Sequence, residues 1–236
     1  MNIAMLMNDN AYAGREYLDC LEKAKISVDV IIFGKHPIKD AFEDKRCSGL
    51  WNPKKLSKFK DKYTIYRFSS IKEKTFLKHL DKKKYSLGVQ GGTNIIKEEV
   101  FLKFKLGIIN FHPGNLPRYA GCTAPEWQVY EGKKIFCTCH FIDEGIDTGP
   151  ILKKKKLNVH KNSYGSMRAS IYPEIAKFLV DIIKQLQNDD KNFFLKINYQ
   201  KINNRIYRKP ISSTKLKRVK LIIKNNYKVS IQIKNC

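Results

Sequence analysis

Three polar residues, Asn110, His112 and Asp147, have side chains that suit acyl transfer to an amine. Asn110 and His112 stand two apart at the end of the apolar run 107–111, so a strand would present both on the same face. A histidine can take a proton near neutral pH, an Asn amide can donate to a developing oxyanion, and a nearby Asp can orient the imidazole and stabilise its charged form. The alternative is structural: a strand end, a packed loop histidine and an Asp that shapes a turn.

The apolar periodicity predicts alternating strands and helices in the first half of the chain. Short runs rich in β-branched residues predict strands, and apolar residues three or four apart predict helices. The expected strands are 2–7, 27–33, 63–68, 85–90 and 107–111, and the expected helices are 12–23, 71–80 and 94–104. This alternation predicts an α/β fold with a Rossmann-like, doubly wound, mostly parallel sheet. Ligands bind such sheets beyond the carboxyl ends of the strands, which directs attention to the loops after residues 90 and 111.

The elements of the second half are a helical turn, two strands and a long helix. The turn is expected over 124–130, the strands over 134–143 and 150–157, and the helix from Ser163 towards residue 186. Apolar residues at helical spacing give that helix one buried face, and Pro173 is expected to kink it.

The C-terminal residues have a different composition from the rest of the chain. Residues 201–236 are rich in Lys and Arg and contain no Asp or Glu. The apolar runs 221–223 and 229–233 predict strands, so a small appendage such as a hairpin is expected. We therefore divide the chain into a catalytic domain, residues 1–190, and a small basic C-terminal extension, residues 191–236.

The charge of the protein is strongly positive. Lys and Arg number 46 against 22 Asp and Glu, a formal net charge of +24 at pH 7. Such a balance attracts phosphates, so a non-catalytic nucleic-acid-binding protein is an alternative interpretation. The lysines are spread along the chain, whereas a binding surface concentrates charge on one face, and the interleaved aromatic residues of base-stacking proteins are lacking. The even distribution of the lysines therefore favours a general lysine-rich composition over a dedicated nucleic-acid-binding surface.

The cysteine pattern and the lengths of the apolar runs predict the cellular compartment of the protein. Six scattered cysteines without a CxxC pair predict reduced thiols and not a disulfide scaffold. Cys137 and Cys139 would share one strand face, but no second pair completes a zinc site. No apolar run approaches the roughly 20 residues that span a bilayer, and the N-terminus lacks the basic start of a signal peptide. A cytoplasmic protein without a metal or a membrane partner is expected.

The segment 109–151 resembles the folate-dependent formyltransferase family. That family's pattern is roughly N-x-H-P-(S/G)-x-L-P-x-Y-x-G, then a helix with Trp, then T-x-H-x-x-(D/E)-x-x-x-D-x-G. The matching residues are Asn110, His112, Pro113, Gly114, Leu116, Pro117, Tyr119, Gly121, Trp127, Thr138, His140, Asp143, Asp147 and Gly149. The similarity is strong over residues 89–152 and weak after Asn162. Ala120, where Arg is common, and Phe136, where Gly is usual, depart from the pattern outside the catalytic positions.

The resemblance implies a formyltransferase fold, 10-formyltetrahydrofolate as the donor and three catalytic residues. The family's Asn, His and Asp fall on Asn110, His112 and Asp147. By this resemblance His112 helps to deprotonate the acceptor amine and, with Asn110, stabilises the tetrahedral oxyanion, while Asp147 holds His112 charged. The pterin is expected against loop backbone, and the expected cofactor-binding residues are Gln90, Gly91, Gly92, Cys139, His140 and Asp143.

The branches of the family differ in their acceptor. The glycinamide ribonucleotide branch has a Gly- and Ser-rich phosphate loop where this chain reads MNDNAYAG, and the methionyl-tRNA branch has a larger C-terminal domain. The chain resembles most the branch that acts on nucleotide-linked amino deoxysugars of polysaccharide biosynthesis, whose members often form homodimers. A tRNA acceptor remains the alternative, because the basic tail would attract tRNA. The expected acceptor-binding residues are Asn10, Tyr12, Asn115, Arg118 and Tyr119.

Overall fold

The computed structural model describes residues 1–34, 44–160, 162–188 and 197–234. Its main sheet has seven strands in the order β3-β2-β1-β4-β5-β7-β8. The strands are β1 (Ile3–Asn8), β2 (Asp29–Phe33), β3 (Ile65–Phe68), β4 (Leu87–Gln90), β5 (Ile108–His112), β7 (Phe136–Phe141) and β8 (Ile151–Lys156). The first five are parallel, and β7 runs antiparallel to both β5 and β8. The predicted doubly wound, mostly parallel sheet is therefore confirmed.

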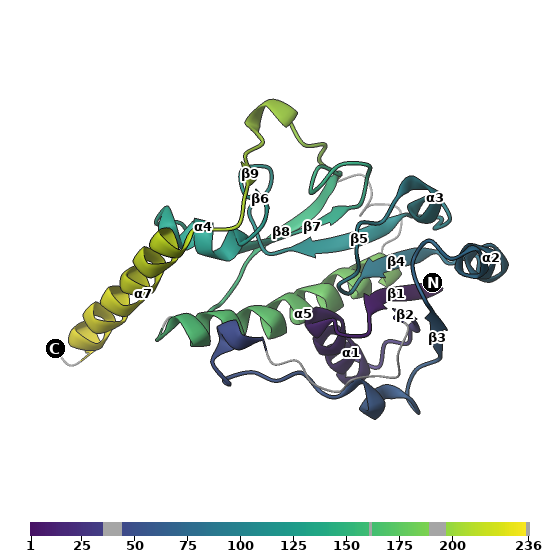
Figure 1. Ribbon diagram of the computed structural model, residues 1–236, viewed down its shortest axis with the longest axis horizontal. Helices are drawn as coiled ribbons and strands as arrows, with labels where there is room; N and C mark the ends of the chain where they lie inside the picture. The colour runs from purple at the N-terminus through teal and green to yellow at the C-terminus, as the bar shows by residue number, and fades with distance from the viewer. Residues whose placement is uncertain (35–43, 161, 189–196, 235–236) are drawn as a thin grey trace.

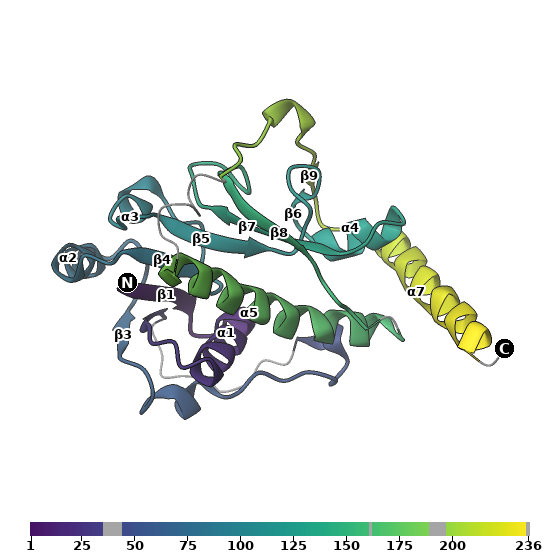
Figure 2. The same cartoon turned by 180° about the vertical axis from the view of Figure 1, so that it is seen from behind.

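Helices lie on both faces of this sheet (Figures 1 and 2). The helices are α1 (Tyr12–Lys23), α2 (Lys74–Lys83), α3 (Glu98–Phe101), α4 (Ala124–Tyr130), α5 (Tyr164–Asn188) and α7 (Ser213–Lys234), with 3-10 turns η1 (Lys45–Cys47), η2 (Leu56–Phe59) and η3 (Ile202–Asn204). Side chains of α1 and α5 form the larger apolar core with one face of the sheet, and α2 and α3 contribute to a second core on the other face. The central strand β1 is buried on both faces, as its uninterrupted apolar run requires.

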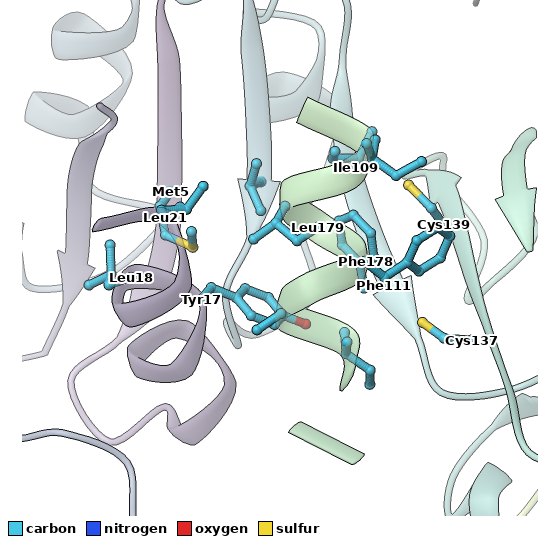
Figure 3. Close-up of a cluster of buried hydrophobic side chains, with 14 of the residues drawn as sticks. Met5, Tyr17, Leu18, Leu21, Ile109, Phe111, Cys137, Cys139, Phe178 and Leu179 are labelled. Atoms are coloured by element: carbon cyan, nitrogen blue, oxygen red, sulfur yellow. The ribbon is translucent and has the colours of Figure 1, made fainter. Parts of the chain in front are cut away.

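The larger core explains the spacing of residues in β5 and β7 (Figure 3). Ile109 and Phe111 of β5 and the two cysteines of β7, Cys137 and Cys139, point towards Phe178 of α5 and are buried. The ring of Phe111 meets that of Phe178 edge to face at 5.4 Å. Because side chains alternate along a strand, the residues between these core positions face the other side of the sheet.

A buried ionic cluster joins α5 to two other parts of the fold. The guanidinium of Arg168 on α5 lies 3.7 Å from Asp44 and 3.6 Å from Glu126 of α4. Hydroxyl groups complete the cluster, because Tyr172 donates to Asp44 at 2.7 Å and Tyr164 donates to Glu126 at 2.8 Å. Asp44, Glu126 and Arg168 are all nearly inaccessible to solvent. Asp44 also pairs with the exposed Arg46 at 2.8 Å, so Glu126 is the carboxylate that depends most on Arg168 for charge compensation.

Two predicted elements were wrong. The helix expected over 94–104 is reduced to the short α3, because Lys97 has extended backbone angles. The hairpin expected in the tail is instead the helix α7, which packs against α4. Its buried residues Val219 and Ile223 are four apart, so the apolar residues of the tail follow the helical period, and their β-branched character misled the strand prediction.

The chain before α7 adds a small second sheet. Strands β6 (Ala120–Gly121) and β9 (Tyr207–Arg208) pair in parallel above the main sheet (Figure 1). The predicted domain boundary at residue 190 lies outside the described residues. Within those residues, no helix is long and apolar enough to cross a membrane.

Candidate active site

Strands β5 and β7 bring three of the predicted site residues onto one face of the sheet. The antiparallel pairing places Asn110 opposite His140 and His112 opposite Thr138. The loop after β5 lies against this face, because the Thr138 hydroxyl donates to the carbonyl of Gly114 at 2.6 Å and accepts from the amide of Leu116 at 3.2 Å. Strand register and this loop together fix where Asn110 and His112 stand.

Asp147 comes to these residues from the loop between β7 and β8. Its Oδ2 atom accepts a hydrogen bond from the backbone N–H of Gly121 at 2.7 Å and lies 3.4 Å from Nδ1 of His112. Its Oδ1 atom lies 3.6 Å from Nε2 of His140. The carboxylate is therefore held between two imidazoles, with its backbone in the left-handed region at φ 56°.

The His112 ring has a defined proton position. Its Nε2 atom lies 2.6 Å from the carbonyl oxygen of Tyr119, which can only accept, so Nε2 carries the proton and donates it. Nδ1 then has a lone pair beside Asp147. Burial lowers the pKa of His112 below its ordinary value, and the Asp147 carboxylate opposes that shift only in part. The resting ring is neutral, with its basic nitrogen next to a carboxylate.

His140 and Asn110 form the other side of the carboxylate. His140 donates from Nδ1 to the carbonyl of Phe141 at 2.7 Å, so its Nε2 accepts from Nδ2 of Asn110 at 3.2 Å. The second N–H of the Asn110 amide is available to a ligand oxygen. Burial raises the pKa of Asp147, but the hydrogen bond from the Gly121 amide stabilises the carboxylate, and the net direction is below the ordinary value. Asp147 is therefore ionised at neutral pH.

Two glycines of the motif are required by close contacts around these groups. A Cβ atom on Gly114 would lie 2.5 Å from Nε2 of His112 and 2.5 Å from the Tyr119 carbonyl oxygen, the two atoms that form the hydrogen bond. A Cβ atom on Gly149 would collide with the carbonyl oxygen of Phe141. Both positions admit only glycine without a shift of backbone, which explains their place in the motif.

A pocket of about 110 Å³ opens at this face of the sheet. It is lined by Gln90, Ile95, Ile96, Asn110, His140, Ile142, Asp143, Gly145, Ile146 and Asp147. The pocket thus brings together two predicted catalytic residues and three predicted cofactor-binding residues, Gln90, His140 and Asp143. His112 is not on its wall and lies next to Asp147. Two apolar side chains at this pocket are unusually accessible, Ile95 at 70% and Ile146 at 47%.

The other predicted cofactor-binding residues, Gly91, Gly92 and Cys139, do not line this pocket. A Cβ atom on Gly91 would lie 2.7 Å from Sδ of Met5, and one on Gly92 would lie 2.9 Å from Cβ of Ala11. Gly91 therefore allows a close approach to β1, and Gly92 allows a close approach to the start of α1. The Cys139 thiol is in the core on the opposite face of the sheet, so only its backbone faces the Asn110 side. Among the described residues, no group of three His, Cys, Asp or Glu side chains is placed to hold a metal ion.

The predicted acceptor-binding residues fall into three separate places. Asn115, Arg118 and Tyr119 line a pocket of about 420 Å³ with Lys133 and Lys134 among its other residues. Asn10 lines a polar pocket of about 230 Å³ at the carboxyl ends of β1, β2 and β3. Tyr12 packs in an aromatic cluster, with its ring 6.3 Å from that of Trp51.

Backbone groups and one distant side chain at the site were missed from the sequence. The carbonyl of Tyr119 and the amide of Gly121 orient His112 and Asp147, and main-chain groups have no signature in residue types. Gln200 was also missed, although its amide donates to the carbonyls of Asp147 and Gly149 at 3.0 and 2.8 Å. It is far from the motif in sequence, so no local spacing could have revealed it.

This chain matches known proteins in sequence and in fold. The family model described as formyl transferase matches residues 1–183. The methionyl-tRNA formyltransferase of Thermosynechococcus vestitus is 34% identical over 84 residues, which are 35% of this chain and 25% of that protein. The chain thus aligns with only about a quarter of the length of this curated relative.

Three solved structures share the fold. A sugar N-formyltransferase from Shewanella sp. FDAARGOS_354 has a TM-score of 0.58 and 17% identity, with 94% of this chain and 88% of that chain covered. Phosphoribosylglycinamide formyltransferase from Bacillus halodurans has a TM-score of 0.61 and 17% identity, with 83% and 100% covered. WlaRD, a sugar 3N-formyltransferase studied with dTDP and 5-N-formyl-tetrahydrofolate, has a TM-score of 0.54 and 20% identity, with 88% and 69% covered.

Proposed function

Because this chain belongs to the formyl transferase family, we propose that it moves the formyl group of 10-formyltetrahydrofolate onto an acceptor amine. One observation carries the proposal. Asn110 and Asp147 share the wall of the 110 Å³ pocket, and the neutral His112 ring directs its basic nitrogen at Asp147 from 3.4 Å. The cavity thus has a hydrogen-bond donor for an oxyanion on its wall, and a base for an ammonium proton lies behind the Asp147 carboxylate.

The Asn110 amide serves the first step. The amine nitrogen attacks the formyl carbon, a C–N bond forms, and the carbonyl electron pair moves onto the formyl oxygen. One N–H of Asn110 is held by His140, which orients the amide, and the other donates to the developing oxyanion. A preorganised donor in a site with little water stabilises this charge more than water does.

The His112–Asp147 pair moves the proton. The attacking nitrogen becomes cationic and must lose a proton before the tetrahedral intermediate collapses. Asp147 lies on the pocket wall and His112 lies behind it, so the proton must pass the Asp147 carboxylate to reach Nδ1 of His112. The negative charge of Asp147 then stabilises the imidazolium that forms. The pair then returns the proton to N10 of the folate as the C–N10 bond breaks, which leaves the formylated amine and tetrahydrofolate.

The pocket suits an aromatic donor with polar edges. Its isoleucines supply apolar walls for a flat ring, and Gln90 and Asp143 supply polar groups for the pterin's donors and acceptors. The exposed side chains of Ile95 and Ile146 at the same pocket would be covered by the ligand. The relative WlaRD was studied with a formyl-tetrahydrofolate, which supports a folate donor for this chain.

We favour a nucleotide-linked amino deoxysugar as the acceptor. The sugar N-formyltransferase from Shewanella covers 94% of this chain, whereas the phosphoribosylglycinamide enzyme covers 83%. This support is at the level of the fold. The pocket lined by Arg118, Lys133 and Lys134 offers positive charge to the diphosphate of such an acceptor, and the backbone of Tyr119, at the same pocket, contacts His112.

Methionyl-tRNA is the second candidate acceptor. The aligned relative from T. vestitus is a methionyl-tRNA formyltransferase, and α7 carries exposed Lys and Arg side chains without an acidic residue. A cationic helix of this kind would contact the phosphates of tRNA and release counterions. Turnover of tRNA should then fall steeply as salt rises, whereas turnover of a sugar nucleotide should respond much less.

The test is a formylation assay with defined acceptors. The purified protein is mixed with 10-formyltetrahydrofolate and, in separate reactions, nucleotide-linked 3-amino and 4-amino sugars, initiator methionyl-tRNA or glycinamide ribonucleotide. Mass spectrometry detects the gain of one formyl group. His112→Ala should abolish the reaction, and His160→Ala, at an exposed histidine outside the site, should leave it unchanged.

Each outcome of the assay decides one part of the proposal. Formylation of an amino sugar that depends on His112 supports both the reaction and the acceptor. Formylation of tRNA alone retains the reaction and replaces the acceptor. If every acceptor stays unmodified and the protein does not bind folate, formyl transfer by this chain is ruled out.

A further inference from the structure

Residues 197–211, the segment between α5 and α7, run beside the loops that carry the site. The backbone of Asn198 exchanges two hydrogen bonds with Ile151 at the start of β8, at 2.8 and 2.9 Å. Further along, the amide of Ile206 donates to the carbonyl of Pro117 at 3.1 Å, and the carbonyl of Arg208 accepts from Cys122 at 2.8 Å. The segment is therefore bonded to both the loop after β5 and the start of β8.

Gln200 in this segment holds the backbone around Asp147. One amide group donates to two carbonyls, that of Asp147 at 3.0 Å and that of Gly149 at 2.8 Å. The guanidinium of Arg205 donates to the preceding carbonyl, that of Ile146, at 2.8 Å. Asp147 has a left-handed backbone conformation, which is unfavourable for a residue with a Cβ atom and persists only where the surroundings enforce it.

The same segment also holds the partner of the Asp147 side chain. Strand β9 pairs with β6, with Gly121 opposite Arg208, and the amide of Gly121 is the donor to Oδ2 of Asp147. The guanidinium of Arg208 bonds Glu131 at 2.6 Å and lies over the rings of Tyr119 and Trp127. Residues 197–211 thus fix the Asp147 carboxylate in two ways. They bind the backbone around Asp147, and they hold the Gly121 strand whose N–H donates to the carboxylate.

We infer that Gln200 is a positioning residue of the catalytic centre, which holds the Asp147 carboxylate at His112 by its two hydrogen bonds to the loop backbone. The inference rests on the proposed function for its effect on catalysis. It does not depend on the identity of the acceptor. It also implies that the segment after α5 is needed for the geometry of the site, although it is outside the formyl transferase motif.

The test replaces Gln200 by glutamate, which has nearly the same shape and at neutral pH cannot donate. Gln200→Glu should lower kcat by roughly tenfold to a hundredfold, because small displacements of catalytic groups have effects of this size. The KM for the acceptor should stay the same, because Gln200 is not placed at a substrate pocket. Gln200→Ala, which removes the donors without adding a charge, should behave similarly. Gln185→Glu is the control, because Gln185 lies on α5 and accepts from Lys153.

A second measurement needs no substrate. If Gln200 positions Asp147, the amide hydrogen of Gly121 should exchange with solvent faster in both Gln200 variants, as followed by NMR. The His112 pKa should also fall, because the nearby carboxylate raises it. Unchanged exchange and an unchanged His112 titration in a folded variant would overturn the inference, as would a wild-type kcat. If the wild-type protein transfers no formyl group, the proposed function fails, and these NMR measurements still decide the positioning role.

Discussion

The Nδ1 atom of His112 lies 3.4 Å from Oδ2 of Asp147, while the opposite ring nitrogen donates to the Tyr119 carbonyl. The ring can therefore gain a proton at one position only, and that position faces a carboxylate. Burial keeps the ring neutral at rest, and the carboxylate stabilises the charge once a proton arrives. This arrangement suits the proposed role of the pair as proton acceptor, and the following predictions test that role and the residues around the pair.

Asn110 is predicted to act through its N–H groups. Asn110→Asp keeps the size of the side chain and replaces both donors by a negatively charged oxygen. We expect kcat to fall on the order of a hundredfold to a thousandfold, the range for loss of one oxyanion donor. Steady-state kinetics with the acceptor found in the formylation assay would measure the change. Asn188→Asp, at an exposed position at the end of α5, is the control. An Asn110→Asp enzyme with full activity would remove Asn110 from the mechanism.

The pH dependence follows from the lowered pKa of His112. The ring must be neutral to accept a proton, so kcat should stay high until the pH falls below about 6.5, the ordinary histidine value. In Asp147→Asn the His112 pKa should fall further, because the carboxylate raises it. An NMR titration of the His112 ring would measure both values. A His112 pKa above 6.5 in the wild-type protein would contradict the neutral resting state.

The lowered pKa of His112 also makes the stability of the fold depend on pH. The folded-state pKa of His112 lies below its unfolded value, so the unfolded chain binds the proton first as pH falls. The contribution of His112 to stability is therefore complete above about pH 6.5 and is lost below it. Urea unfolding of the wild-type protein and of His112→Gln at several pH values would measure this contribution. The difference in the free energy of unfolding between the two proteins should become smaller as the pH falls below about 6.5.

The buried ionic cluster around Arg168 is predicted to matter for stability far more than surface ion pairs on the same helix. Arg168→Met leaves the buried Glu126 carboxylate without its paired cation, while Asp44 keeps Arg46, and we expect a loss of about 3 to 5 kcal/mol, the range for removal of one partner of a buried pair. Lys177→Met is the matched control, because Lys177 is exposed and pairs with Glu174 at 3.0 Å, which is worth under about 1 kcal/mol. Equal unfolding midpoints for the two variants would show that the cluster is not essential.

The exposed isoleucine Ile146 is predicted to contact the folate. Ile146→Ser removes apolar area that the ligand would cover. We expect the free energy of folate binding to weaken by about 1.4 kcal/mol, which raises the dissociation constant roughly tenfold. Calorimetric titration with 5-formyltetrahydrofolate would measure the dissociation constant. Leu221→Ser on α7, which is also exposed, should leave the affinity unchanged. Equal affinities of the wild-type protein and Ile146→Ser would place the folate elsewhere.

Much of the fold was predictable because it depends on local spacing. The period of two along 107–111 puts Asn110 and His112 on the same face, and the structure confirms the strand as β5. The apolar residues of 12–23 likewise predict α1 with its exact bounds. In the tail the local pattern misled, because a run of β-branched residues is compatible with both the strand and the helix period. The helix is favoured by the packing of α7 against α4 and by the burial of Val219 and Ile223, which are four residues apart.

The residue types of the site were determined by the sequence alone, and their working arrangement by the tertiary structure. The motif identifies Asn110, His112 and Asp147, but the proton on Nε2 of His112 depends on a backbone carbonyl that the loop brings near. Likewise, the conformation of Asp147 depends on Gln200, which approaches only after the chain has passed through α5. A motif records side-chain identity along one segment. Contacts between distant segments and main-chain groups arise only when the whole sheet and its loops have folded around them.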